Sequence, residues 1–309
     1  MEALAIPFLL FVGSLLALQA AANVQLSSAM ASPFGASTLQ LGIGAALLLL
    51  LAGAGGSLGA FGLLAQAEPW EFLGGLGSAI YITSGIVLFP RLGAVVTVGL
   101  WIAGQMLASL VLDGFGWLGL EPDPLGAPEL LGAAAVLSGA TMIVLAQAEG
   151  QALRGVLRER SAWLGLGLLA GAALPIQGAV NAELRAELDA PIATGALSFL
   201  VATAAMGSLL AATLTVAGGP GPRVGPLRTV PWWGWLGGLV GATYVTAVFS
   251  LMPEIGAAPT IALTVAGQQV ASVLVDRFGL FRLPRRRVSA LRLGALTALL
   301  AGMGLIQMG

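Results

Sequence analysis

The sequence predicts an all-α integral membrane protein in which ten transmembrane helices form two inverted five-helix repeats. Three observations lead to this prediction: an apolar composition, an internal duplication and an arginine distribution that favours one side of the membrane. Of the 309 residues, 58% are hydrophobic and only 9% are charged, whereas soluble domains carry about 25% charged residues. The bilayer, and not water, is therefore the expected solvent of this chain.

The composition also excludes several kinds of chemistry. The chain contains neither Cys nor His, so disulfides, thiolate metal sites and Cys nucleophiles are ruled out. No paired carboxylates fall within an apolar segment. We therefore expect no enzymatic activity, no metal and no cofactor, and the net charge of −1 disfavours a nucleic-acid partner.

Ten segments have the length and hydrophobicity of membrane helices, which need about 20 mostly apolar residues. Short connections rich in Gly and Pro separate them. The segments are 3–23, 37–56, 70–89, 93–112, 129–147, 162–181, 193–216, 232–251, 257–275 and 289–307.

The chain contains an internal duplication. Residues 70–116 align without gaps with 233–279, and 22 of these 47 positions are identical, whereas chance matching would give roughly one in ten. Residues 13–33 align with 171–191 in the same way, at an offset of 158 instead of 163. The sequence thus predicts one five-helix repeat in residues 1–150 and a second in 151–309.

The arginines predict how the repeats lie in the membrane. Twelve of the 13 Arg fall in the loops after the odd-numbered segments, and only Arg185 falls on the other side. Because basic residues stay in the cytoplasm, both termini are expected outside. Five helices is an odd number, so the second repeat should have the opposite orientation to the first.

One polar stripe recurs in both repeats. On the helix predicted at 93–112, a polar or aromatic side chain recurs every four residues, and these side chains therefore share one face of the helix. The stripe consists of Thr97, Trp101, Gln105 and Ser109, and its counterpart of Thr260, Thr264, Gln268 and Ser272. We expect Gln105 and Gln268 to face each other across the middle of the bundle and to bind solute; the alternative is that they hold closely packed helices together beside Gly104 and Gly267.

Amides also recur on the first helix of each repeat, as Gln19 with Asn23 and as Gln177 with Asn181. Lipid cannot satisfy a side-chain amide, so these residues should point into the bundle. They either line a solute cavity or hold helices together through hydrogen bonds. Their recurrence at paired positions favours the cavity.

Three aromatic residues are further candidates for solute contact. Tyr81 and Tyr244 occupy equivalent positions on faces of small residues, where close helix packing explains them as well as stacking on a solute does. Trp101 could form an aromatic wall for a flat or cationic solute. Its repeat partner is Thr264, so such a role would be asymmetric, and a Trp that faces lipid or packs between helices is the favoured explanation.

Four carboxylates could couple transport to an ion: Asp113, Glu183, Glu254 and Asp276. Asp113 and Asp276 are equivalent and lie at helix ends, where solvation before a Gly stop is the simpler explanation. Glu183 and Glu254 have no matching acid in the other repeat. The coupling ion therefore stays open.

Three motifs together resemble the drug/metabolite transporter superfamily, and within it the YdcZ-type branch. They are residues 175–184 (PIQGAVNAEL), 235–245 (WLGGLVGATYV) and 267–279 (GQQVASVLVDRFG), and each has an echo in the first half. The resemblance covers nearly the whole chain and implies an inverted-repeat carrier. The small multidrug-resistance branch keeps a glutamate on its first helix, where this chain has Gln19 and Asn23.

These observations favour a secondary transporter in the inner membrane that moves a small organic solute by alternating access. The absence of an obvious fixed charge favours a neutral, zwitterionic or weakly charged solute. The expected partners are this solute and the lipid bilayer, with the protein a monomer or a homodimer. The alternative is a membrane receptor or scaffold that does not transport.

Overall fold

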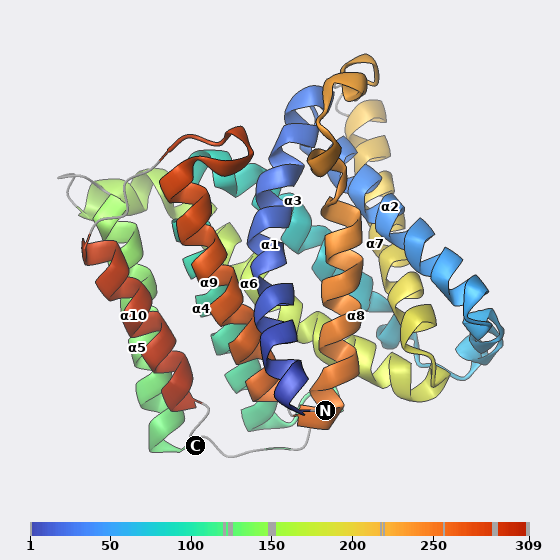
Figure 1. Ribbon diagram of the computed structural model, residues 1–309, viewed down its shortest axis with the longest axis horizontal. Coiled ribbons are helices and arrows are strands. Elements are labelled where there is room, and N and C mark those ends of the chain that lie inside the picture. Colours follow the sequence, from blue (N-terminus) through green and yellow to red (C-terminus); the bar gives the residue numbers. More distant parts are fainter. Residues whose placement is uncertain are drawn as a thin grey trace.

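The computed structural model describes residues 2–119, 122, 126–147, 153–216, 218, 220–255, 257–285 and 290–306. These residues form ten α-helices, one for each predicted segment, and no β-strand (Figure 1). The helices are α1 (Glu2–Met30), α2 (Pro33–Ala54), α3 (Gly75–Leu92), α4 (Ala94–Phe115), α5 (Ala127–Gln147), α6 (Leu153–Leu188), α7 (Pro191–Thr215), α8 (Gly237–Ile255), α9 (Ala257–Phe278) and α10 (Ala290–Ile306). Short 3-10 segments are η1 (Ser57–Ala65), η2 (Pro69–Gly74), η3 (Gly225–Thr229), η4 (Trp232–Trp235) and η5 (Leu280–Arg282).

Six helical stretches are long and apolar enough to cross a membrane. They are Ile6–Met30, Pro33–Ala54, Pro69–Leu92, Ala94–Phe115, Arg160–Leu188 and Pro191–Thr215. Shorter apolar helices occur at Ala127–Gly139 and Gly237–Leu251. Among the described residues, α5, α8, α9 and α10 are thus helical without meeting this standard for a span, so ten spans remain a prediction.

Equivalent residues begin and end equivalent helices. Pro33 and Pro191 open α2 and α7, where the missing N–H of proline matters least because the first turn has no partner for it. Gly116 and Gly279 follow α4 and α9 in the left-handed conformation, each with φ of 61°. Glycine accepts this conformation without strain, so both helices stop just before it, three residues beyond the ends predicted from hydropathy.

Some helix ends differ from the prediction. α1 continues to Met30 and α6 begins at Leu153, because hydropathy marks the membrane-spanning part of a helix and not the helix itself. Pro90, predicted to lie between helices, is inside the last turn of α3. η2 and η4 precede α3 and α8 at equivalent positions, so the duplication extends to these turns.

Helix packing links the two halves of the chain reciprocally. α1 packs on α9 as α6 packs on α4, and α8 contacts α1 and α2 as α3 contacts α6 and α7. α2 with α7, α4 with α9 and α5 with α10 are contacts between counterparts. The α5–α10 pair stands at one edge of the molecule, beside α4 and α9 (Figure 1).

The counterparts that touch run antiparallel. Asp276, near the end of α9, bonds to the first residue of α4. Gly302, late in α10, lies against Gly132, early in α5. α1 begins and α10 ends at the lower end of the molecule in Figure 1, whereas the segments around η3 and η5, coloured orange and red, lie at the upper end.

Glycines set two equivalent close approaches between the halves. A Cβ placed on Gly13 of α1 would lie 2.0 Å from the carbonyl oxygen of Thr264 on α9. On Gly171 of α6, it would lie 2.1 Å from the carbonyl oxygen of Trp101 on α4. Small residues let membrane helices approach this closely, and they bring α1 and α6 against the helices that carry the polar stripes.

Candidate functional site

The amides singled out from the sequence are all buried. None of their side chains is more than 3% exposed, although they come from α1, α4, α6 and α9. They therefore point into the bundle, as predicted, and none faces lipid. The six residues are Gln19, Asn23, Gln105, Gln177, Asn181 and Gln268.

The amides of α1 lie against the start of α8. The Nε2 of Gln19 donates to the carbonyl of Gly237 at 2.5 Å. The Oδ1 of Asn23 lies so close to Gly237 that a Cβ there would be 1.9 Å away. Neither side-chain polar atom of Asn23 has a hydrogen-bond partner.

The amides of α6 lie against the start of α3 in the same way. Gln177 and Ser78 exchange hydrogen bonds of 2.8 and 3.0 Å, and the Nδ2 of Asn181 donates to Ser198 at 3.2 Å. The counterpart of Ser78 is Gly241, which has no hydroxyl, so Gln19 turns to a backbone carbonyl instead. Part of the amide set thus holds helices together, as the alternative explanation predicts.

An aromatic cluster fills the space between α3 and α4. The ring centroids of Tyr81 and Trp101 are 4.1 Å apart, and those of Phe89 and Trp101 are 5.5 Å apart. The indole of Trp101 donates to Ser84 at 3.2 Å. Trp101 is wholly buried, so it packs and does not face lipid.

The polar stripe of α9 meets both tyrosines. The hydroxyl of Tyr81 donates to the Oε1 of Gln268 at 3.4 Å, and Tyr244 is hydrogen-bonded to Thr264. Tyr244 also lines a pocket of about 20 Å³ together with Gln177 and Asn181. This volume holds about one water molecule.

Several buried polar groups in this region lack partners. Both amide atoms of Gln105, the Nε2 of Gln268 and the Oδ1 of Asn181 are buried without a hydrogen bond. Each unmade bond costs about 1–3 kcal/mol. α4 and α9 touch each other, but whether Gln105 faces Gln268 remains a prediction.

The serines at the ends of the two stripes differ. Ser272 is buried and donates to the carbonyl of Gln269 on its own helix, whereas Ser109 is half-buried. The hydroxyl of Thr97 is buried without a partner. Thr260 and Glu254 are residues whose side chains lie outside the described part of the structure.

Gln40 and Glu71 are buried polar residues that were not singled out from the sequence. The side-chain amide of Gln40 lies at the start of α8. Its Nε2 donates to the carbonyl of Gly234, and its Oε1 accepts from the N–H of Gly238. Gln40 is equivalent to Ser198, so extending the second alignment past Pro33 would have revealed it. Glu71 is buried with one carboxylate oxygen unpaired, and no periodic pattern marks it in the sequence.

Asp276 differs from the expectation of a solvated helix end. Its carboxylate is buried and accepts from the N–H groups of Ala94 and Val95, both at 3.0 Å. A carboxylate suits the N-terminus of a helix, where the amides are free and the dipole is positive. Asp276 therefore caps α4 in the other half of the molecule.

The site thus consists of paired amides where the two halves meet, inside a bundle of apolar helices. A family model described as "Putative inner membrane exporter, YdcZ" matches residues 4–142 and 162–305. The chain belongs to this YdcZ family of the drug/metabolite transporter superfamily. The two matched segments fit a tandem of two family units, and the family places the chain among multi-pass inner-membrane transporters and not among enzymes.

A solved structure supports the fold alone. Its title reads "Crystal structure of protein", and it superposes with a TM-score of 0.57 at 20% sequence identity, over 99% of this chain and 96% of the other. A search of curated proteins gave no match.

Proposed function

We propose that the protein is a secondary transporter that exports a small neutral, zwitterionic or weakly charged organic solute by alternating access. The solute would bind between the two halves, among the amides of α1, α4, α6 and α9. The observation that carries the proposal is the set of buried amide groups without partners.

The unsatisfied amides favour binding over a purely structural role. An amide that only holds helices together would have both its donor and its acceptor engaged, because a buried unmade bond costs about 1–3 kcal/mol. Gln105 and Asn23 engage neither. A solute with hydroxyl, amide or amino groups would supply the missing partners and recover this free energy.

The pocket beside Gln177 and Asn181, at about 20 Å³, is smaller than a site for an organic solute. Binding would therefore require the halves to move apart. The described conformation corresponds to a closed stage of the cycle, from which one side opens.

Inverted repeats would supply the two open conformations. In such transporters each half can adopt the shape of the other, which exchanges the inward-open and outward-open states. The antiparallel contacts between counterparts support inversion, as does the reciprocal packing of α1 on α9 and α6 on α4. The arginine distribution supports an orientation with both termini outside the cytoplasm.

The proposal is tested by export from proteoliposomes loaded with a cell metabolite extract. Solutes lost in a protein-dependent way are identified by mass spectrometry. The double variant Gln105→Leu with Gln268→Leu removes hydrogen-bonding groups at similar volume, so we expect the loss rate to fall at least about tenfold, the effect of roughly 1.4 kcal/mol. Leu50→Ala, at a 72% exposed position on α2, is the control.

Two outcomes would contradict the proposal. Unchanged loss rates in the double variant would remove the amides from the site. Solutes that raise the thermal stability of the wild-type protein, without any solute being lost from the vesicles, would instead indicate a receptor.

A further inference from the structure

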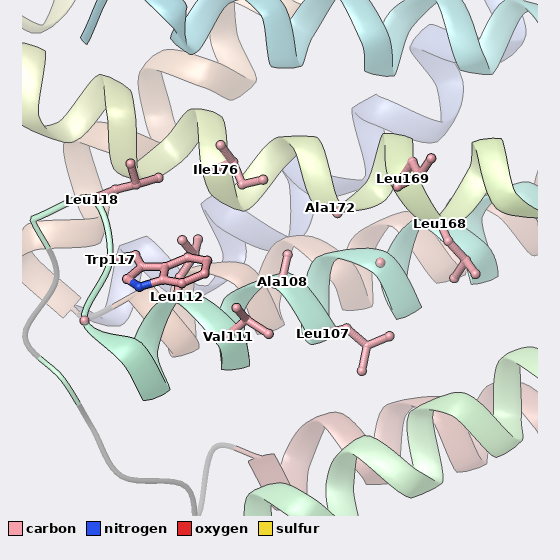
Figure 2. A pocket seen from close by; sticks show the side chains of 12 residues that line it. Leu107, Ala108, Val111, Leu112, Trp117, Leu118, Leu168, Leu169, Ala172 and Ile176 are labelled. Atoms are coloured by element: carbon pink, nitrogen blue, oxygen red, sulfur yellow. The ribbon is translucent and has the colours of Figure 1, made fainter. Parts of the chain in front are cut away.

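The outer face of the molecule carries an apolar groove between α4 and α6 (Figure 2). Its volume is about 670 Å³, within the range of about 300–1,000 Å³ that small-molecule sites occupy. Figure 2 shows Leu107, Ala108 and Val111 along the α4 wall and Leu169 and Ile176 along the α6 wall. None of the six buried amides lines this groove, although Gln105, Gln177 and Asn181 belong to the same two helices.

The groove opens toward the surroundings of the protein. Leu169 is 70% exposed, and Val111 and Ile176 on the rim are 41% and 44% exposed. Its lining side chains are all apolar, apart from the indole nitrogen of Trp117. Both walls belong to candidate membrane spans, so hydrocarbon is the medium that meets this surface.

The length of the groove matches one leaflet of a bilayer. It runs along α4 from Gly104, in the middle of the helix, to Gly116 and Trp117 just past its end. At 1.5 Å per residue this distance is about 18 Å, and half of the hydrocarbon core is about 15 Å. Trp117 is 56% exposed at the end of the groove, as tryptophans at the membrane interface are.

The end of the groove beside Trp117 is acidic. The carboxylate of Glu183 lies against Gly119, two residues beyond Trp117. Glu68, Glu183 and Glu187 are close enough to Glu71 to act on its charge. Arg185 at this end donates to the carbonyl of Phe249 on α8. A headgroup here would meet negative charge.

We propose that the groove binds one acyl chain of a zwitterionic phospholipid, with the ammonium of its headgroup beside Glu183. The acyl chain covers the apolar walls, the glycerol region lies at Trp117, and the ammonium interacts with the carboxylate. An anionic headgroup without an ammonium is repelled at the same place. This lipid site does not depend on the transport proposal, because it lies on the outer side of α4 and α6.

Fluorescence quenching of Trp117 tests the site. The protein is placed in bilayers containing increasing fractions of phosphatidylethanolamine or phosphatidylglycerol with brominated acyl chains, and the signal of Trp117 is taken as wild type minus Trp117→Phe. We expect saturable quenching, with half-saturation at about fivefold lower fraction for the ethanolamine lipid, the effect of one elementary charge near the membrane surface. Glu183→Gln should reduce this preference to near unity.

Variants whose side chains fill the groove distinguish a lipid that is bound there from bulk lipid that touches Trp117 by chance. Ala108→Phe should abolish the saturable part of the quenching, whereas Leu50→Phe on the exposed face of α2 should leave it unchanged. Val111→Phe, on the rim, replaces Ala108→Phe if that variant does not fold. Both groove variants leave the amides of the proposed solute site in place.

Three results would overturn the inference. The first is quenching that rises in proportion to lipid fraction and is the same in the filled variants. The second is an equal or greater effect of the phosphatidylglycerol. The third is a Trp117 signal that neither lipid quenches, which would mean that protein and not lipid covers the groove.

Discussion

The two halves of the molecule have equivalent helices and tyrosines, but different side chains surround Tyr81 and Tyr244. In the first half, Trp101 and Ala20 of α1 both lie against Gly85 of α3, and the indole packs at a tilt on the ring of Tyr81. In the second half, a small pocket lies beside Tyr244, and the counterpart of Trp101 is the smaller Thr264. Gly178 and Val248, the counterparts of Ala20 and Gly85, line that pocket together with Tyr244.

The comparison shows that the two halves share the same contacts between helices. The side chain at one equivalent position, Trp101 or Thr264, differs between the halves, and a pocket lies beside the tyrosine of the second half. The close approaches at Gly13 and Gly171 are the same in both halves. The space beside Tyr81 is closed by an indole, whereas the space beside Tyr244 stays open next to Gln177 and Asn181. Beside the open space, Gln177 is fully engaged with Ser78, so Asn181, whose Oδ1 has no partner, is the amide there that a solute could contact.

The largest expected effect comes from giving the first half the side chain of the second. Trp101→Thr removes a wholly buried indole with its contacts to Tyr81 and Phe89, and we expect a loss of about 3–5 kcal/mol in the free energy of unfolding. Unfolding in detergent, followed by circular dichroism, measures this loss. Trp232→Thr, at a 74% exposed position, is the control. Equal free energies of unfolding for Trp101→Thr and Trp232→Thr would contradict the conclusion that the indole of Trp101 fills the space beside Tyr81.

The next effect tests the contacts that the halves share. Gly13→Val and Gly171→Val each place a Cβ against backbone of the other half, so each should lower the free energy of unfolding by about 1–3 kcal/mol or more. The two losses should be similar. Gly165→Val on α6, where no atom lies within 4 Å of an added Cβ, should change stability little. A loss in only one half would break the equivalence.

A third variant closes the open half. Thr264→Trp places an indole into a pocket of about 20 Å³, and the resulting strain should lower the free energy of unfolding by about 1–3 kcal/mol. In the metabolite-loaded proteoliposomes, solute export should fall at least about tenfold. Thr264→Ser, which keeps the hydroxyl and adds no volume, should export at close to the wild-type rate. Export by Thr264→Trp at the wild-type rate would place the solute path elsewhere.

The smallest expected effect on stability comes from removing the hydroxyl of Ser78, whose counterpart in the second half is Gly241. Ser78→Gly removes both hydrogen bonds to Gln177, which are worth about 0.5–1.5 kcal/mol each, so the midpoint of thermal unfolding should fall by a few degrees. Gly241→Ser should change it less, because an added Cβ meets only the far end of the Gln19 side chain on α1 and the ring of Phe199 on α7. If Gly241→Ser were the more harmful change, the two amide pairs would not be equivalent.

The sequence predicted the helices better than it predicted the partners of polar side chains. Periodicity and hydropathy placed all ten helices and the burial of Gln19, Asn23, Gln105, Gln177, Asn181 and Gln268, because lipid leaves an amide no partner outside the bundle. Asp276 was expected to be solvated, yet it caps α4 from the other half. Such a contact joins residues 182 positions apart, and no local pattern encodes it.

The sequence by itself determined the all-helical membrane class and the duplication within the chain, since both are carried by composition and by identity at a fixed offset. Only the tertiary structure decided which amides are engaged, that Trp101 fills one half, and that α4 and α6 enclose a groove toward the bilayer. These features depend on distances between helices far apart in the chain. Those distances are set by the close approaches at Gly13 and Gly171, which packing alone reveals.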